Sequence, residues 1–412
     1  MKMRRNYQPR LECLEARDVP AFSITQSNAV LFLKGTRHAD FVLIEDLGNN
    51  DIQITQNGTS SIYSGINRIN VKAGPGDDTV LYSVVSPSLR LWLDVDLGAG
   101  NDRFEGSVTL LPEEEGVLAL SGGSRRLPPS NVHRIDVSGG SGNDNITLTA
   151  EGYLPPGVSL QANLRGGSGR DNILTALSGQ NDGDVRIRMD GQSGDDNLAA
   201  ILGRSTGPVS VNTGTIDIRV DGGSGRDVIN SWIGVDSGDE FAPSAGVVNT
   251  GDINIRLDGQ SGDDRVSFLS GVGSAFASAI INSGLLNVKV EGGSGNDVVV
   301  ADIGDEIDNG FGDLFFNFSN VGIFHLLTEG GSGRDEVTNV VWIENSENGT
   351  FRGRSYGNSG RDSLYYEFRR SGDNPLNAQA TLFADSKDDP VLASAIVQVL
   401  KARRVTIIPD IV

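Results

Sequence analysis

The sequence contains few cysteine, histidine and aromatic residues. Cys13 is the single cysteine among 412 residues, so no disulfide can form within the chain and no thiolate metal site is available. The three histidines, His38, His133 and His325, are far apart in sequence, and aromatic residues make up 6%. No apolar run approaches the roughly 18 residues of a transmembrane helix, so we expect no transmembrane segment. An aliphatic core is therefore expected.

Positive charge is also scarce. Lys and Arg total 34 whereas Asp and Glu total 54, which gives a net charge of −20. A chain this acidic repels nucleic acid and anionic membranes, so we expect neither as a partner and expect cations instead. Glycine, in contrast, is abundant, because 54 of the 412 residues are Gly. That share is nearly twice the usual value of about 7%.

One glycine-rich pattern, Gly-x-x-Gly-x-Asp-x-aliphatic, recurs twelve times, and we call each copy a corner. The sixth position is Asp and the eighth is apolar in all twelve corners. Clear copies start at Gly139, Gly166, Gly191, Gly222, Gly259, Gly292, Gly330 and Gly357, and weaker copies start at Gly35, Ala73, Leu97 and Ala384. Such regularity indicates one internally repeated architecture rather than several domains.

Alternating apolar and polar residues precede several corners, at 185–189, 216–220, 253–257 and 286–290. A period of two predicts half-buried strands. A second turn precedes three of these strands, at 212–214, 249–251 and 282–284, where Asn and Gly are expected to supply positive φ. One such coil cannot bury its apolar face, whereas stacked coils can.

The repeat therefore predicts an all-β fold, a right-handed parallel β-helix or β-roll of about twelve coils. We expect an N-terminal export or surface segment over 1–22, the solenoid over 23–385 and a C-terminal cap over 386–412. The cap is expected to hold a helix over 390–404 followed by a strand over 405–408. A decayed corner near 122–124 would fill the 42-residue interval between Leu97 and Gly139. A β-propeller is the runner-up, but its blades of about 40–45 residues are too long.

The corners resemble the glycine-rich nonapeptide repeat of RTX proteins, a calcium-binding β-helix signature. The resemblance covers roughly residues 35–391 and is most specific from Gly139 to Leu364. It implies Ca²⁺ held between stacked corners by the position-six carboxylates and corner carbonyls. RTX proteins repeat the nonapeptide in direct tandem, whereas here each coil carries one corner. The implied ligands are Asp144, Asp171, Asp196, Asp227, Asp264, Asp297, Asp335 and Asp362.

The segment from Pro9 to Ala21 resembles the Leu-Glu-x-Leu-Glu-x-Arg opening of many planctomycete surface and secreted proteins. It lacks the apolar core of an ordinary signal peptide. Together the two resemblances imply an extracellular or cell-surface, calcium-binding solenoid with a structural or adhesive role, which folds when export brings it to calcium. The expected partners are calcium and cell-surface polysaccharide or other surface proteins.

A metal-free solenoid is the first alternative, because stacked carboxylates can also be neutralised by protein cations. Position five of successive corners alternates in sign through Arg170, Asp195, Arg226 and Asp263, which suggests a ladder of salt bridges. The strands add a basic column beside an acidic column. The basic column is Arg188, Arg219, Arg256 and Lys289, and the acidic column is Asp190, Asp221, Asp258 and Glu291.

A parallel β-helix polysaccharide lyase or hydrolase is the second alternative, with the basic column binding an acidic glycan. The sequence has no His-Glu-x-x-His, Gly-x-Ser-x-Gly or Walker motif. We therefore assign no catalytic or cofactor-binding residue and do not expect an enzyme.

Overall fold

The structure is a computed structural model of the whole chain. It describes residues 21–84, 90–110, 131–203, 210–234, 246–271, 280–304, 306–308, 314–316, 318–345, 349–371, 377–383 and 396–399. All regular elements in these ranges are β-strands, and most pair in parallel, so the expected all-β solenoid class is confirmed. None of the described residues lies in a helix long and apolar enough to span a membrane.

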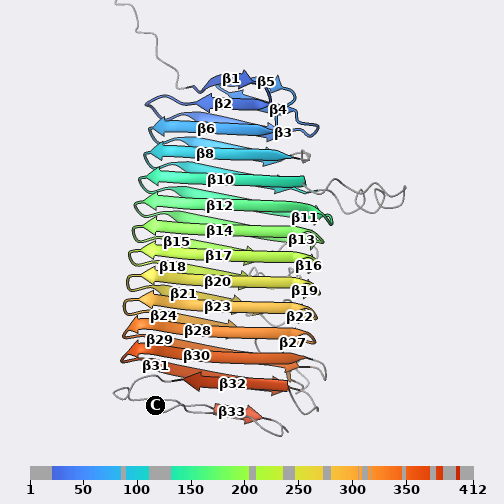
Figure 1. Cartoon of the computed structure of the whole chain (residues 1–412), viewed down its shortest axis with the longest axis vertical. Coiled ribbons are helices and arrows are strands. Elements are labelled where there is room, and N and C mark those ends of the chain that lie inside the picture. Colours follow the sequence, from blue (N-terminus) through green and yellow to red (C-terminus); the bar gives the residue numbers. More distant parts are fainter. Residues whose placement is uncertain are drawn as a thin grey trace, which may run out of the picture.

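The coils stack as a rod whose wide side is one thirteen-stranded sheet, the first sheet (Figure 1). All pairings from β2 to β32 are parallel and join each coil to the next, which excludes a β-propeller. Its strands are β1 (Ser23–Ser27), β2 (Val30–Lys34), β6 (Arg68–Pro75), β8 (Leu91–Ala99), β10 (Asn131–Ser141), β12 (Val158–Ser168), β14 (Asp184–Ser193), β17 (Thr215–Ser224), β20 (Asp252–Ser261), β23 (Leu285–Ser294), β28 (Ile323–Gly333), β30 (Thr350–Gly360) and β32 (Asn377–Phe383).

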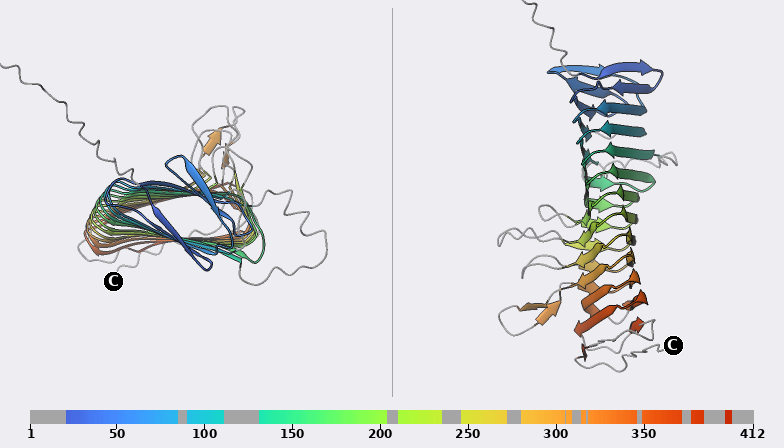
Figure 2. Two further views of the ribbon diagram at one scale, coloured as in Figure 1. Left: turned by 90° about the horizontal axis from the view of Figure 1, so that it is seen from above. Right: turned by 90° about the vertical axis from the view of Figure 1, so that its left-hand side faces the viewer.

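The second sheet lies opposite the first and closes a flattened cross-section (Figure 2). Its longer strands are β3 (Phe41–Asp46), β7 (Thr79–Val84), β9 (Arg103–Thr109), β11 (Asn145–Leu154), β13 (Asn172–Asn181), β15 (Asn197–Leu202), β18 (Val228–Ile233), β21 (Arg265–Ser270), β24 (Val298–Ile303), β29 (Glu336–Asn345), β31 (Ser363–Ser371) and β33 (Ile396–Val399). Short strands continue the middle coils, namely β16 (Ser210–Asn212), β19 (Val247–Asn249), β22 (Ile280–Asn282) and β27 (Phe318–Asn320).

Each corner joins a strand of the first sheet to a strand of the second. In the coil of β17, for example, the corner leads into β18, and the second turn after β19 leads back into β20. The alternating runs predicted at 185–189, 216–220, 253–257 and 286–290 lie within β14, β17, β20 and β23, so these strands are confirmed.

The core is a continuous column of aliphatic side chains between the two sheets. On β17, Ile216, Ile218 and Val220 are at most 2% exposed, while the residues between them face solvent or lie at the surface. Register pairs Ile218 with Ile187 in one neighbouring coil and Ile255 in the other, so like side chains stack along the rod. Burial of this column drives association of coils that are unstable alone.

The N-terminal end of the rod differs from the coils that follow. Strand β1 pairs antiparallel with β2, and β3 pairs antiparallel with β4 (Ile52–Gln56), which pairs in turn with β5 (Thr59–Tyr63). These hairpins occupy the end of the first coil, where an exposed parallel edge would otherwise invite further strand pairing. Residues 1–20, including most of the expected export segment, lie outside the described ranges.

Two expectations are wrong. Strands β8 and β10 are direct neighbours, with Gly98 paired to Gly140, so no decayed coil is inserted at 122–124. Within the helix expected over 390–404, the described residues Ile396–Val399 form strand β33, which pairs in parallel with β31. Tertiary pairing overrides the local helical pattern at these four residues. The remainder of the expected cap, with the weak corner starting at Ala384, lies outside the described ranges.

A separate antiparallel pair, β25 (Glu306–Asp308) with β26 (Leu314–Phe316), lies in the long insertion between β24 and β27. It projects from the side of the rod in Figure 2. Loop insertions of variable length thus emerge between strands while the cross-section of the coils stays constant.

Candidate functional site

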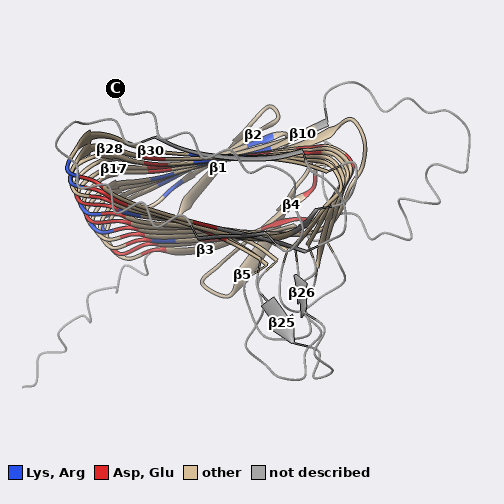
Figure 3. Cartoon of the chain, turned by 90° about the horizontal axis from the view of Figure 1, so that it is seen from below, with Lys and Arg blue, Asp and Glu red and all other residues tan. Residues whose placement is uncertain are grey.

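The sixth-position aspartates form a file along one narrow edge of the rod, at the corners. Figure 3 shows acidic and basic segments gathered at this edge when the rod is viewed along its axis. The aspartates themselves are buried, with exposures between 1% and 4%. They are Asp40, Asp78, Asp102, Asp144, Asp171, Asp196, Asp227, Asp264, Asp297, Asp335 and Asp362. The structure therefore brings together all eight sequence-predicted site residues.

Each carboxylate from Asp78 to Asp362 accepts a hydrogen bond from the coil before it. The backbone N–H of Asp196 donates to Oδ1 of Asp227 at 2.8 Å, and the N–H of Asp227 donates to Oδ1 of Asp264 at 2.7 Å. The same bond, between 2.7 and 3.0 Å, joins every successive pair from Asp40 to Asp362. We call these ten bonds the carboxylate ladder. They explain the invariance of Asp, because an amide in a buried turn needs an acceptor.

The glycine at position one is explained by the other carboxylate oxygen. A Cβ on Gly139 would lie 2.4 Å from Oδ2 of Asp144 and 2.4 Å from the carbonyl oxygen of Gly166. The same close approach recurs at the other clear corners. In the clear corners, Oδ2 thus occupies the space that a side chain at position one would take. The corners starting at Ala73 and Leu97 carry a buried side chain there.

Positions two and four need glycine for a different reason. In the corner starting at Gly222, Gly223 has a φ of 108° and Gly225 has a φ of 136°, conformations that L-residues rarely adopt. A Cβ on Gly225 would also lie 1.8 Å from the carbonyl oxygen of Gly194 in the preceding coil. Gln192 and Gln260 hold position two at 73° and 71°, so this position tolerates a side chain at some strain.

Burial dominates the electrostatics of the carboxylate file. Desolvation raises the pKa of Asp102, Asp196 and Asp264 from 3.8 to about 7, against the lowering effect of the backbone N–H each accepts. Neighbouring aspartates raise these pKa values further. The pKa of Asp144, Asp227, Asp297 and Asp335 rises to about 6 for the same first reason. Ionised carboxylates in this row therefore carry an electrostatic cost that protons or cations would relieve.

The second oxygen of each carboxylate, Oδ2, is the atom that could contact a cation. Among the described residues, no hydrogen-bond partner reaches the buried Oδ2 atoms of Asp78, Asp102, Asp144, Asp171, Asp196, Asp227, Asp264, Asp297 and Asp335. Ca²⁺ takes six to eight oxygens at about 2.3–2.6 Å. Two successive corners offer a Ca²⁺ ion two free carboxylate oxygens. The carbonyl oxygen at position three is already used, because it accepts a hydrogen bond from the position-four N–H of the preceding coil. For example, the N–H of Gly194 donates to the carbonyl oxygen of Ser224 at 2.8 Å.

The corners as described therefore do not fit a complete calcium shell. The described ranges contain no group of three or more His, Cys, Asp or Glu side chains suited to a metal ion. The free oxygens are also closed off from solvent, so water cannot supply the missing ligands. The calcium ligand set implied by the RTX resemblance stays a prediction.

Position five forms a second, outer row with a role the charge pattern did not reveal. Asp and Asn at this position accept a hydrogen bond from the position-five N–H of the next coil. For example, the N–H of Arg226 donates to Oδ1 of Asp195 at 2.9 Å. The expected salt bridges occur in part. Arg170 and Arg226 both lie 3.7 Å from Oδ2 of Asp195, but their side chains are 74% and 73% exposed. Such exposed pairs stabilise a fold little.

The basic and acidic columns on the first sheet do pair with each other. Arg219 bonds Asp221 at 2.8 Å within one strand, and Arg256 bonds Asp258 at 3.1 Å. Lys289 and Arg256 also reach acids in neighbouring strands, which links the columns into a network. Three of the four residues proposed to bind a glycan in the lyase alternative are therefore committed to internal ion pairs.

The second turns contain an asparagine ladder that the sequence analysis missed. The amide of Asn212 donates to Oδ1 of Asn249 at 2.7 Å, and Asn249 donates to Asn282 at 2.8 Å. The buried file runs from Asn181 through these residues to Asn320. Asn212, Asn249 and Asn282 do not have positive φ, so that expectation is wrong. The available signal was the recurrence of Asn two residues before Gly, as at 212–214, 249–251 and 282–284.

The paired glycines of the second turns are likewise needed for close approach. A Cβ on Gly251 would lie 2.1 Å from the carbonyl oxygen of Gly214, and one on Gly284 would lie 2.0 Å from that of Gly251. Both narrow edges of the rod are thus built from residues whose size or hydrogen bonding is set by the next coil.

Comparison with known proteins yields no match to a family model, a curated protein or a solved structure.

Proposed function

We propose that this chain is a structural solenoid, a rigid rod that serves outside the cell or at its surface as a spacer or adhesive element. The carboxylate ladder is the single observation that supports this most directly. It places a buried hydrogen bond between every pair of successive coils from Asp40 to Asp362. A rod linked in this way resists local bending and opening.

The ladder also favours the cation-free form of the solenoid over the calcium-bound form. Oδ1 of each carboxylate is held by a backbone amide, so the corner closes with the protein's own donors. The surface location rests on the resemblance of the segment from Pro9 to Ala21 to exported planctomycete proteins.

A calcium-bound form is the second candidate, and it is supported by the row of buried Oδ2 atoms with raised pKa values. If calcium binds there, these carboxylates would hold it, and the ion would supply the neutralising charge. The two forms differ in one measurable property, which is whether the folded state depends on the ion.

The deciding experiment is thermal unfolding of the full chain, followed by circular dichroism in EDTA, in millimolar Ca²⁺ and in millimolar Mg²⁺. The cation-free solenoid predicts the same β-signal and melting temperature in all three. A folded state that forms only with Ca²⁺ would show that the cation-free proposal is wrong. Small-angle scattering then tests the rod, because twelve coils at about 4.8 Å give a length of roughly 55 Å.

A further inference from the structure

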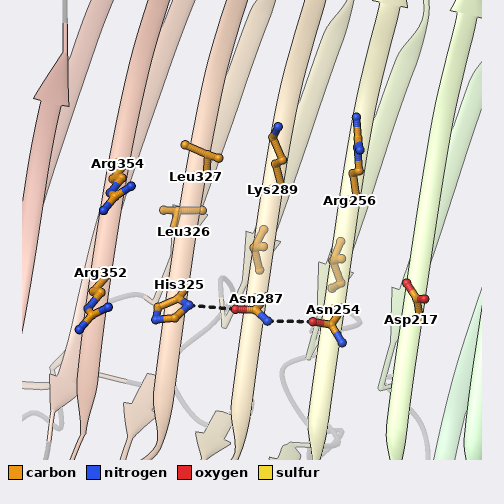
Figure 4. Close-up of a pocket in the computed structure, with 12 residues that line it drawn as sticks. Asp217, Asn254, Arg256, Asn287, Lys289, His325, Leu326, Leu327, Arg352 and Arg354 are labelled. Carbon is orange, nitrogen blue, oxygen red and sulfur yellow. Dashed lines mark hydrogen bonds between the residues drawn. The ribbon is translucent and has the colours of Figure 1, made fainter.

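The outer face of the first sheet carries a groove of about 440 Å³ near the C-terminal end of the rod. It crosses five strands, from β17 to β30, and two rows of side chains line it (Figure 4). The first row is Asp217, Asn254, Asn287, His325 and Arg352, and the second is Arg256, Lys289, Leu327 and Arg354. Strand register places the members of each row on adjacent strands. We call this feature the basic groove.

The four cations of the groove differ in their partners. Arg256 lies 2.9 Å from Glu291, and Lys289 lies 2.7 Å from the same residue, so both belong to the ion-pair network. Arg352 and Arg354 form no ion pair with any described residue, and both are exposed. The acidic column ends one strand earlier, because register pairs Glu329 with Tyr356 on β30. Two guanidinium groups are thus left free at one end of the groove.

The first row is a polarised chain of hydrogen bonds. His325 Nδ1 donates to Asn287 Oδ1 at 3.1 Å, and Asn287 Nδ2 donates to Asn254 Oδ1 at 2.8 Å. In this arrangement His325 Nε2 and the Asn254 amide N–H groups face the groove without a described partner. This acceptor and this donor lie two strands apart, at about 9.6 Å, and together they suit a ligand that carries several hydroxyl groups.

We propose that the basic groove binds an acidic polysaccharide, with Arg352 and Arg354 on its carboxylates and the Asn–His row on its hydroxyls. Arg is suited to this because its planar fork matches a carboxylate bidentately. Leu327, which lies in the second row between Lys289 and Arg354, offers an apolar contact for the carbon face of a sugar ring. Five strands at about 4.8 Å span roughly 19 Å, which fits an extended chain of several sugars.

The same features disfavour other polyanions. The net charge of −20 opposes nucleic acid, whose phosphates need many more cations than two free guanidiniums. The groove lies on the face of a sheet rather than at an edge, so a peptide cannot pair its backbone there by strand addition. Amide and imidazole groups that alternate with cations instead match a ligand with both hydroxyls and carboxylates.

The test is affinity electrophoresis and calorimetry of the full chain with polygalacturonate in EDTA, with dextran, polyglutamate and poly-dT as comparison ligands. Wild type is expected to bind polygalacturonate more tightly than the other three. Replacing both free cations (Arg352→Gln with Arg354→Gln) should weaken binding by about tenfold or more. Leu327→Glu, which places an acid in the groove, should weaken it independently.

A matched control exists at the corners. Arg170 and Arg226 are 74% and 73% exposed, and both lie outside the groove. Arg170→Gln with Arg226→Gln removes the same charge and should leave binding within about twofold of wild type. Absent binding, equal loss in both double variants, or tighter binding of polyglutamate or poly-dT would each overturn the proposal. Unchanged circular dichroism confirms that all variants fold.

Discussion

The backbone amide of Asp196 donates to the carboxylate of Asp227, 31 residues later in the sequence and one coil further along the rod, across 2.8 Å. Both residues are at most 2% exposed. The aspartate of each corner therefore completes the hydrogen bonding of the corner before it. This relationship makes the role of the repeat architectural in the first instance, and it determines how substitutions at the corner should behave.

Substitutions of Asp227 should separate the contribution of its hydrogen bond to stability from the contribution of its charge. Asp227→Ala leaves the buried N–H of Asp196 without an acceptor, so we expect the free energy of unfolding to fall by about 1–3 kcal/mol. Asp227→Asn keeps an acceptor oxygen and removes the charge of a carboxyl group whose pKa is raised to about 6 by burial. It should therefore lower the free energy of unfolding less than Asp227→Ala does. Urea unfolding in EDTA measures both. Equal destabilisation by Ala and Asn would argue that the charge itself is required, as calcium binding implies.

Position four should tolerate no side chain in a corner that stacks on a preceding coil. Gly225→Ala combines a φ of 136° with a Cβ only 1.8 Å from a carbonyl oxygen of the neighbouring coil, so we expect a loss above about 4 kcal/mol or failure to fold. Gly58→Ala is the matched control, since its φ of 71° is also positive but no atom lies within 4 Å of the added Cβ. It should cost about 1–2 kcal/mol. Soluble expression and melting temperature report both, and a mild effect at Gly225 would contradict the described stacking.

The asparagine ladder should contribute measurably to stability. Asn249→Ala removes bonds to Asn212 and Asn282, both near 2.7–2.8 Å, and leaves their buried amide groups partly unsatisfied. We expect a loss of about 2–4 kcal/mol from two buried bonds and a small cavity. Asn230→Ala, on the outer face of β18, is the control and should change stability by less than about 0.5 kcal/mol. Similar losses for the two variants would show that the ladder is not a structural element.

Stability should fall as the pH rises from about 5 to 8. The folded-state pKa values of Asp102, Asp196 and Asp264 are about 7, above the unfolded value of 3.8, so the folded chain binds more protons in this range. Their contribution is complete below the unfolded pKa and is lost as the pH passes the folded pKa. Each fully differing group adds a slope of up to about 1.4 kcal/mol per pH unit.

Melting temperatures in EDTA at several pH values within that window test this expectation. If the melting temperature stays constant or increases as the pH rises, protonation of the buried carboxylates does not stabilise the folded chain. Repeating the series in Ca²⁺ distinguishes the two forms of the solenoid. The cation-free form should give the same profile as in EDTA, whereas bound cations would keep the carboxylates ionised and flatten the profile.

The architecture of this protein follows in large part from its repeat. Asp at position six and an apolar residue at position eight, held through twelve copies, predict stacked coils because an isolated coil leaves its apolar face uncovered. The alternation in strands such as 216–220 correctly places Ile216, Ile218 and Val220 inside. The opposed basic and acidic columns were also predictable, since residues two apart on a strand face the same side.

Only the tertiary structure shows which atoms the recurrent aspartate of the corner contacts. Whether Asp227 holds an ion, a proton or an amide depends on the lateral placement of coils joined by loops of variable length, which periodicity does not specify. The same holds for the asparagine ladder and for the basic groove, where Asn254, His325 and Arg352 come from three strands spread over about a hundred residues. Sequence patterns determine which residues face inward or outward within a coil, whereas contacts between coils arise only when the stack is assembled.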